Sequence, residues 1–442
     1  MTRKPPVELG EYKSIRVPAP APTSADLRLS EQLEGRDLAP RISVKWLANS
    51  EVEITTYSWV GVVRFSQLDI HVVPKLVGGA VGVLKMLEYA AGISLLKRIN
   101  SDRPLPANGK DLFDLICMLL AEETKALVRD GVLRDYRPVD EAIEVVRGRI
   151  RYRDQYLRRY GQLQPLECHY DEYDSDTPDN QLIMAALSAA RKGVQDLDVR
   201  ASLMRLESLM VEVCEPPTVE PAWYEQVIQY GRRNTRYRPA HQLSLLVLRA
   251  TALDNIYDTS AGSVSSFMLN MNTIFERFVS RLAEESLQGS DLSVERQASL
   301  RAVIQDDVTG RSYGTLRPDL VVRHGPSGRC VPIDIKYKLY DRKKVSTGDI
   351  YQLFLYAYAL GADNAHRQAG LIYPAAKAES GPVLSIKPFA APTAARILGE
   401  GLDVTAALKA IGSNDTAQLY RDVRLIIERV TGLDAAKVVV SA

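Results

Sequence analysis

The sequence predicts an α+β protein of several domains, because three patterns follow one another along the chain. Short alternating segments occupy residues 41–77, amphipathic stripes dominate residues 111–250, and helices alternate with strands after residue 261. A chain of 442 residues is long enough for roughly two to four domains. We expect a Pro-rich tail at 1–40, a small β-rich domain at 41–100, a mainly helical region at 101–260 and a further α+β domain at 261–442.

The N-terminal part combines a proline-rich lead-in with short predicted strands. Prolines alternate with alanines from Pro18 to Pro22, which predicts an extended tail with little packing of its own. Apolar and polar residues then alternate in Ile42–Trp46 and Val52–Tyr57, which is typical of β-strands. After two glycines, a helix is expected over Val83–Ala91.

The middle of the chain adds two basic clusters to its helical stripes, at 147–153 and 232–238. Arginine guanidinium groups and tyrosine rings both suit a nucleic-acid backbone, and Arg149 and Arg151 are the candidates for DNA contact. An acidic protein partner, or pairing with nearby carboxylates such as Glu172, would explain the first cluster equally well.

A predicted β-hairpin near the C-terminal end contains charges that a buried sheet does not tolerate unpaired. Its strands are Leu316–Val322 and Val331–Lys338, joined by a turn rich in Gly and Pro. Asp319 lies in the first strand, whereas Asp334 and Lys336 share one face of the second, two residues apart. Such charges cost free energy unless they are paired or bind a metal ion. Phosphodiester hydrolysis needs this set, with carboxylates for a divalent cation and a lysine to help activate water.

The segments around this hairpin give the order helix, three strands, helix, strand. The expected elements are helix Phe267–Leu287, strand Ala302–Ile304, the hairpin, helix Thr347–Leu360 and strand Ala369–Tyr373. Beyond them we expect a strand at Val383–Phe389, helices between 393 and 431, and an edge strand at Val438–Val440.

This order, together with Pro318-Asp319 and Asp334-x-Lys336, resembles the PD-(D/E)xK nuclease superfamily. The resemblance implies an αβββαβ core and a Mg²⁺-dependent endonuclease. The site it implies has metal ligands Asp319, Asp334 and Glu276, with Lys336 to activate the attacking water and Gln352 or Tyr356 to place it. The neighbouring charges of Arg317 and Lys338 are candidates to hold flanking phosphates of DNA. A structural ion pair at the end of a sheet is the alternative interpretation of the motif.

Composition restricts the other possibilities. The net charge is +1, so any contact with DNA must come from local patches. The four cysteines show no C-x-x-C pair and no zinc spacing, which predicts reduced thiols in a cytoplasm. No segment reads as a signal peptide or as a bilayer span, and a Walker A sequence is absent. Nucleotide hydrolysis would therefore require another chain.

Several runs, in their order along residues 41–375, resemble the McrC family, the nuclease subunits of McrBC modification-dependent restriction systems. They are Val60–Val63 with Val73–Lys75, Gly131–Tyr136, Arg147–Ile150, Tyr237–Ala240, Met271–Phe278, Asp334–Lys338 and Tyr351-Gln352. The resemblance implies a partner, an McrB-like AAA+ GTPase hexamer that recognises 5-methylcytosine and translocates on double-stranded DNA. It implies that this chain docks through its N-terminal half, inserts into the pore of the ring and stimulates GTP hydrolysis. A β-hairpin within Val44–Val73 is the predicted inserted element.

Two other functions remain open on the sequence. The chain could be chiefly a structural activator of the ring with a minor or inactive nuclease, since most of its length lies outside the nuclease core. A stand-alone repair or recombination nuclease would share only the core and would cut DNA without an NTPase partner. The family pattern leaves residues 1–40 and 390–442 unexplained.

Overall fold

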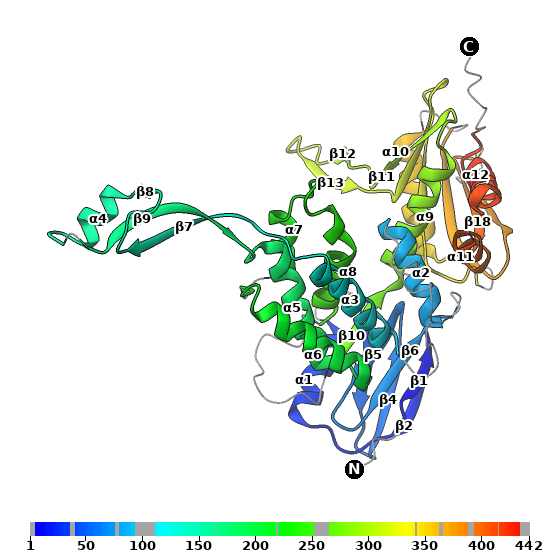
Figure 1. Ribbon diagram of the computed structural model, residues 1–442. Coiled ribbons are helices and arrows are strands. Elements are labelled where there is room, and N and C mark those ends of the chain that lie inside the picture. Colours follow the sequence, from blue (N-terminus) through cyan, green and yellow to red (C-terminus); the bar gives the residue numbers. More distant parts are fainter. Residues whose placement is uncertain are drawn as a thin grey trace.

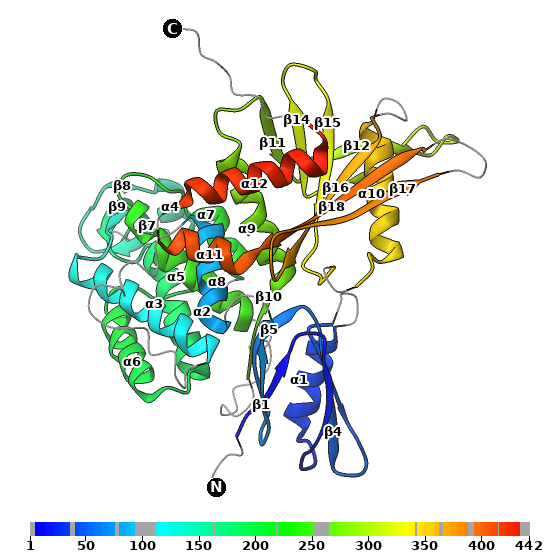
Figure 2. The same ribbon diagram turned by 90° about the vertical axis from the view of Figure 1, so that its right-hand side faces the viewer.

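The computed structural model describes residues 5–35, 40–75, 79–92, 111–162, 164–217, 220–251, 265–340, 343–361, 366–387, 393–413 and 415–433. Its architecture is mixed α+β with several separate sheets, as the sequence predicts. One long arm projects from the body (Figure 1), and the N-terminal strands lie below the C-terminal sheet (Figure 2). Within the described ranges, no helix is both long and apolar enough to cross a membrane.

Two small sheets form the N-terminal part. The larger has the strand order β1 (Val7–Gly10), β6 (Asp69–Val73), β5 (Trp59–Arg64) and β10 (Ser265–Asn270). The smaller has the order β2 (Ser14–Pro18), β4 (Glu51–Thr56) and β3 (Ile42–Trp46), with helix α1 (Ser24–Glu34) packed beside β3. Because β10 joins this part from residue 265 onward, the chain returns to its N-terminal sheet before it enters the C-terminal one.

The expected extended tail is wrong for residues 5–35, which are folded. Strand β1 pairs in parallel with β6, and α1 buries Leu29 and Leu33. Thr23 starts α1 with a capping box, in which its hydroxyl and the Asp26 carboxylate each bond the other's backbone N–H. The alternating prolines are confined to the end of β2 and the short connection to Thr23. They therefore separate the strand from the helix and do not keep the whole segment extended.

A helical body covers one side of the N-terminal sheet. Its helices are α2 (Gly79–Ala91), α3 (Leu112–Arg129), α5 (Pro178–Gly193), α6 (Leu197–Val211), α7 (Pro221–Val227) and α8 (Arg238–Thr251). A buried ion pair ties the two parts together, because Arg64 of β5 contacts the Asp111 carboxylate at 2.5 Å and the carbonyl of Gly193 at 2.7 Å. One continuous apolar core runs from this body into the C-terminal sheet.

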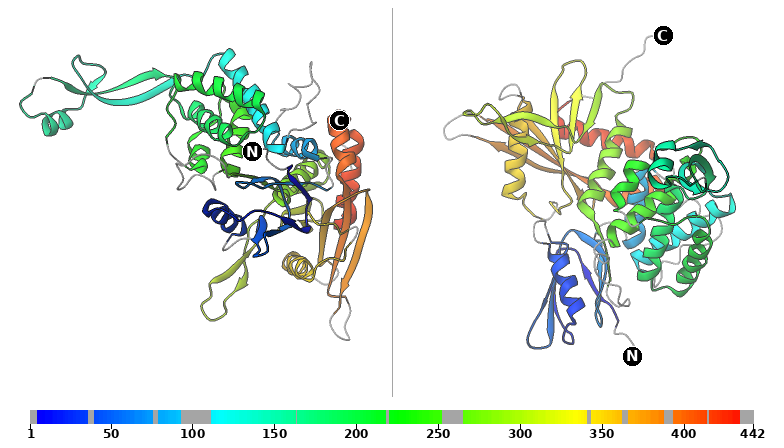
Figure 3. Two further views of the ribbon diagram at one scale, coloured as in Figure 1. Left: turned by 90° about the horizontal axis from the view of Figure 1, so that it is seen from below. Right: turned by 90° about the vertical axis from the view of Figure 1, so that its left-hand side faces the viewer.

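The arm interrupts the region that the sequence predicts to be mainly helical. Its strands β7 (Asp135–Ile143) and β9 (Leu166–Asp174) pair antiparallel along their whole length. Its far end carries the short strand β8 (Arg149–Ile150) and helix α4 (Tyr152–Arg158), well away from the body (Figure 1; Figure 3, left). The prediction of a mainly helical region is wrong in the arm. Neither strand has a continuous buried face that would give a recognisable apolar period in the sequence.

The C-terminal part is built on a six-stranded sheet. Its strand order is β11 (Leu292–Arg296), β14 (Leu320–His324), β15 (Cys330–Ile335), β16 (Gln368–Ala375), β18 (Ala395–Asp403) and β17 (Glu379–Ile386). Helices α9 (Met271–Ser286) and α12 (Thr416–Thr431) share a core with one face, and α10 (Thr347–Leu360) packs on the other. Helix α11 (Val404–Gly412) leads into α12, and strands β12 (Leu300–Gln305) and β13 (Ser312–Leu316) form a separate hairpin beside the sheet.

Several expected elements need their bounds corrected. The helix expected from Phe267 begins at Met271, because Phe267 belongs to β10, and Asn270 caps the helix by accepting a bond from the Asn272 N–H. The strand expected at Ala302–Ile304 exists as β12, but the strand that joins the sheet ahead of β14 is β11. The region from 393 starts with strand β18 before its two helices, whereas Val438–Val440 lies outside the described residues.

Candidate active site

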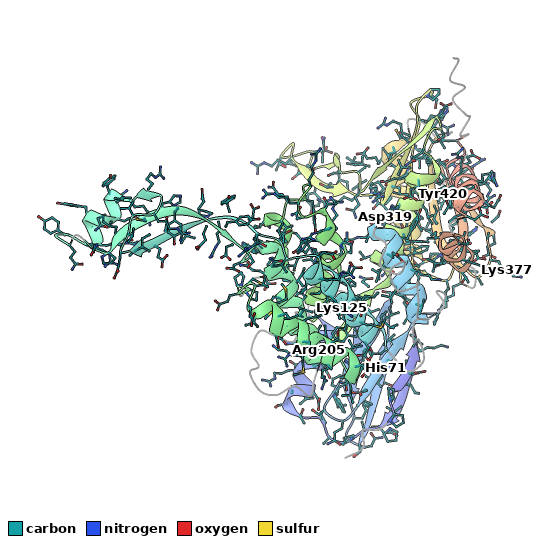
Figure 4. The ribbon with its side chains drawn as sticks, viewed as in Figure 1. His71, Lys125, Arg205, Asp319, Lys377 and Tyr420 are labelled. Atoms are coloured by element: carbon teal, nitrogen blue, oxygen red, sulfur yellow. The ribbon has the colours of Figure 1, made fainter. Side chains whose placement is uncertain are left out.

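Asp319 lies just before the start of β14 and Asp334 lies near the end of β15, and the two come together there. These strands pair antiparallel with Leu320 opposite Ile333, so extending the register by one residue places Asp319 opposite Asp334. Residues directly opposite each other point to the same face of a sheet. The Asp319 Oδ2 atom also accepts a bond of 2.7 Å from the N–H of Ile335, which fixes its carboxylate toward Asp334. Figure 4 shows Asp319 near the root of the β12–β13 hairpin.

Asp334 is buried and Asp319 is half-buried, and the two carboxyls repel each other. Asp334 is 0% exposed. Burial, and then the neighbouring Asp334 charge, raise the pKa of Asp319 from 3.8 to about 7. Burial also raises the pKa of Asp334, although Lys336 opposes this. Two carboxyls that cannot both ionise easily are a feature of sites where a cation or a shared proton belongs.

Lys336 faces the same pair. Its Nζ lies 2.8 Å from Oδ2 and 3.1 Å from Oδ1 of Asp334. The first contact lacks hydrogen-bond geometry, so within the described part of the chain Oδ2 is a buried oxygen without a hydrogen-bond partner. Burial alone would lower the pKa of the Lys336 ammonium, but the carboxylates of Asp334 and Asp319 outweigh it and raise that pKa. Lys336 is therefore charged at neutral pH.

Glu276 stands slightly apart from this pair. It lies on α9, its Oε1 accepts a bond of 3.0 Å from Gln297, and its charge contributes to the raised pKa of Asp319. Among the described residues, no group of three or more His, Cys, Asp or Glu side chains is arranged to hold a metal ion. Asp319 and Asp334 still fit Mg²⁺, which is commonly held by one or two carboxylates with the substrate phosphates. The Oδ2 atom of Asp334, which is ion-paired with Lys336 but accepts no hydrogen bond among the described residues, is a suitable oxygen ligand.

Gln352 and Tyr356 act on the loop before Asp319, not on the carboxylates. Gln352 Nε2 donates to the Tyr356 hydroxyl at 2.9 Å, and that hydroxyl donates to the carbonyl of Arg317 at 3.0 Å. Because Arg317 lies two residues before Asp319, these two hydrogen bonds hold the segment that leads into β14 in place. The Arg317 side chain itself is exposed.

Asp349 is a member of this site that the sequence reasoning missed. Its carboxylate accepts bonds from Lys338 and Ser346, each at 2.7 Å, and from the Tyr340 hydroxyl. These bonds outweigh burial and lower the pKa of Asp349, whose charge in turn helps to raise the pKa of Asp334. Lys338 is therefore already paired. The spacing Ser346-x-x-Asp349 ahead of α10 was the available signal, since it is a helix N-cap pattern.

The two arginines proposed for DNA contact lie in the arm, remote from the carboxylates. Arg151 pairs with Asp140 at 3.1 Å and with Asp154 at 2.5 Å. Arg149 is exposed, and within the described residues it makes no ion pair or side-chain hydrogen bond. Internal pairing, the alternative left open on the sequence, also holds for Arg147, which contacts Glu172 at 3.3 Å.

We expect Mg²⁺ to raise the Tm more at about pH 8 than at about pH 5.5. The stability that the raised pKa of Asp319 contributes is fully present below 3.8 and is lost as the pH rises toward about 7. Above that pH both carboxylates are charged, and a divalent cation relieves their repulsion. Mg²⁺ at about 100 times its Kd should stabilise the fold by about 2.7 kcal/mol.

Thermal unfolding with Mg²⁺ and with EDTA at both pH values measures this difference. Other buried carboxylates contribute equally with and without the cation, so they cancel in the comparison. The Asp334→Asn variant should show almost no Mg²⁺-dependent shift, and a shift of equal size at both pH values would contradict the expectation.

Comparison with known proteins gives a family and a fold. The family described as McrBC 5-methylcytosine restriction system component matches residues 54–374. No curated protein matches the sequence.

Two solved structures from Thermococcus gammatolerans are similar to this chain. A chain in the refined half-complex from a tetradecameric assembly of McrB AAA+ hexamers with bound McrC has a TM-score of 0.56 and 17% sequence identity, covering 93% of this chain and 100% of that one. A chain in the cryo-EM structure of the McrBC complex has a TM-score of 0.45 and 19% identity, covering 64% of this chain and 88% of that one. The first likeness shows a shared fold.

Proposed function

Because the chain belongs to the McrBC family of 5-methylcytosine restriction system components, we propose that it is the DNA-cutting subunit of a GTP-dependent complex directed to 5-methylcytosine. The observation that carries this proposal is the pair of half-buried Asp319 and buried Asp334 with the Lys336 ammonium against it. The chain order α9, β11, β14, β15, α10, β16 supports a PD-(D/E)xK core of the αβββαβ type.

The mechanism is hydrolysis of a phosphodiester bond at the end of β15. When bound by Asp319 and Asp334, Mg²⁺ supplies Lewis-acid stabilisation of the charge that develops on the phosphate. Lys336 orients the attacking water and steadies the same charge, because its ammonium is held beside Asp334. Gln352 and Tyr356 keep Asp319 in position through the Arg317 carbonyl.

Glu276 has a supporting role in this proposal. Its carboxylate lies on α9, accepts a bond from Gln297 and adds negative charge that helps to raise the pKa of Asp319. The exposed Arg317 side chain can contact a flanking phosphate, whereas Lys338 would have to leave Asp349 to do so. We therefore rank Arg317 above Lys338 as a DNA contact.

The arm is our proposed docking element for an AAA+ GTPase ring. The solved structure of similar fold contains McrB AAA+ hexamers with bound McrC, so a partner of that class fits this chain. The strands within Val44–Val73 are packed in the N-terminal sheets, and the arm replaces them as the proposed inserted element. Its tip exposes Tyr152, Tyr156, Leu157 and Tyr160, each at least 66% accessible. Exposed aromatic side chains of this kind favour contact with another protein.

A structural activator with an inactive nuclease is the second candidate, and the arm is the observation that favours it. An arm of this kind can stimulate a ring without any metal site. The two candidates differ in whether DNA is cut, because an activator alone would stimulate GTP turnover without cleaving the methylated DNA.

Reconstitution tests the proposed function directly. We expect this chain to cut methylated double-stranded DNA only when the partner GTPase, GTP and Mg²⁺ are all present, and to raise the GTP turnover of the partner. Gel analysis of DNA and phosphate release are measured in the same mixture, with unmethylated DNA as the control. Cutting without any partner would indicate a stand-alone nuclease, and turnover stimulation without cutting would indicate an activator.

A further inference from the structure

The turn between β1 and β2 reaches across to the end of the proposed catalytic strand. Glu11 lies in this turn and is 1% exposed, although it comes from the N-terminal sheet. The next residue, Tyr12, has a φ of 55°, an unfavourable conformation for a residue with a side chain. A strained turn around a buried carboxylate indicates that surrounding contacts hold this segment in place.

Glu11 accepts a hydrogen bond from the residue that follows Lys336. The Tyr337 hydroxyl donates to Glu11 Oε2 at 3.0 Å, and Tyr337 is 4% exposed. Its ring lies 5.6 Å from the ring of Phe275, the neighbour of Glu276 on α9. Tyr337 therefore lies between Lys336 and Lys338 in sequence. Its side chain contacts both α9 and the turn between β1 and β2.

The backbone leaves the sheet after Lys336, so a side-chain contact is needed to fix the position of the residues that follow. The N–H of Lys336 donates to the carbonyl of Ile372 at 3.0 Å, and beyond it the chain turns, with the Lys338 N–H bonded to the Lys336 carbonyl at 2.9 Å. Sheet pairing thus fixes Asp334 firmly but holds Lys336 from one side. The Tyr337 side chain fixes the other side.

Burying the Glu11 carboxylate costs free energy, which argues that this residue is there to position Tyr337. Its Oε2 also accepts from the N–H of Lys75 at 3.1 Å, but its Oε1 is buried without a hydrogen-bond partner in the described residues. Burial raises the pKa of Glu11 to about 7, although the bonds from Lys75 and Tyr337 oppose the shift. An apolar side chain would fill such a place at lower free energy, whereas a directional bond specifies where Tyr337 lies.

Resting on the proposed nuclease function, we propose that Tyr337 is a positioning residue for Lys336 and that Glu11 anchors it. The N-terminal sheet then sets where the Lys336 ammonium lies relative to Asp334. A misplacement of about 1 Å at a reacting centre can lower a rate by about a hundredfold, so a modest loosening is enough to be measured.

Cleavage kinetics of the full reconstituted complex test this with four variants. Tyr337→Phe and Glu11→Leu should each lower kcat about tenfold and leave the KM for DNA within about twofold, because positioning of the lysine is lost while DNA contacts remain. Glu11→Gln should stay within about threefold of the wild type, since its amide oxygen still accepts from the tyrosine hydroxyl. The Glu11→Leu/Tyr337→Phe double variant should be no slower than either single one, because both remove the same interaction.

Tyr89→Phe is the matched control. The Tyr89 hydroxyl donates to Glu285 at 2.5 Å, so this variant also removes a tyrosine–glutamate bond to α9. Glu285 is nine residues beyond Glu276, about 13 Å along the helix, and kcat per folded molecule should be unchanged. Near-UV circular dichroism gives the folded fraction of each variant.

Two results would overturn the positioning role. One is a wild-type kcat in Tyr337→Phe, and the other is additive losses in the double variant. An Asp334→Ala sample in the same assay keeps the two proposals separate. If Asp334→Ala still cuts, the proposed nuclease site is wrong, whereas an inactive Asp334→Ala beside a fully active Tyr337→Phe removes only the role of Glu11 and Tyr337.

Discussion

Replacing Asp334 by alanine is expected to abolish DNA cutting, with a loss of at least about a thousandfold in kcat, or about 4 kcal/mol of transition-state stabilisation. The variant removes the buried oxygen that is the best available ligand for Mg²⁺ and takes away the partner of the Lys336 ammonium. Loss of the Asp334 carboxylate thus removes both a ligand for the cation and the group that holds the Lys336 ammonium in place.

The same variant should leave the rest of the molecule working. Stimulation of GTP turnover by the partner should stay within about twofold, because the arm lies far from the C-terminal sheet that carries Asp334 (Figure 1). Glu379→Ala, which removes an exposed carboxylate from edge strand β17 of the same sheet, is the matched control and should cut normally. Normal cutting by Asp334→Ala would refute the assignment of the site. Loss of both cutting and stimulation would indicate general unfolding, which thermal melting detects.

The central residues of this site could be predicted because local chain geometry brings them together. A short hairpin fixes the register of its strands, so Asp319 and Asp334 had to lie on one face once the turn between them was identified. The spacing of Asp334 and Lys336 does the same along one strand. The helix over Thr347–Leu360 was also predictable, since Ser346 caps it and its apolar residues keep a helical period.

The parts that could not be predicted depend on contacts distant in sequence. Glu11 and Tyr337 are 326 residues apart, and no local pattern links a carboxylate in a turn to a tyrosine after a strand. The Pro-rich segment looked extended because composition reports its prolines, whereas pairing of β1 with β6 is a long-range contact. In the arm, strand β7 buries none of its residues, so it lacks the alternation of buried and exposed residues on which strand prediction relies.

Shortening the arm should eliminate stimulation of the GTPase partner. Val139 and Tyr170 are paired across β7 and β9, so deleting residues 140–169 and joining these two by Asn-Gly leaves a closed hairpin. The root should stay folded, because the Tyr237 hydroxyl accepts from the Leu133 N–H at 2.6 Å and donates to Asn180 at 3.0 Å. Helix α4 buries none of its residues, so its loss removes little from the core.

GTP turnover in the presence of the shortened chain should fall to the basal rate of the partner, and cutting of methylated DNA should be lost with it. The Mg²⁺-dependent shift in Tm should persist, because Asp319 and Asp334 lie in the C-terminal sheet and keep their surroundings. A full-length variant with Tyr156→Ser and Leu157→Ser tests the tip alone, since both side chains are 66% exposed and removal of their apolar surface should weaken only docking. Full stimulation by the shortened chain would show that another surface contacts the ring. Loss of stimulation with a retained metal-dependent shift would locate docking in the arm and hydrolysis in the sheet, as two separable parts of one chain.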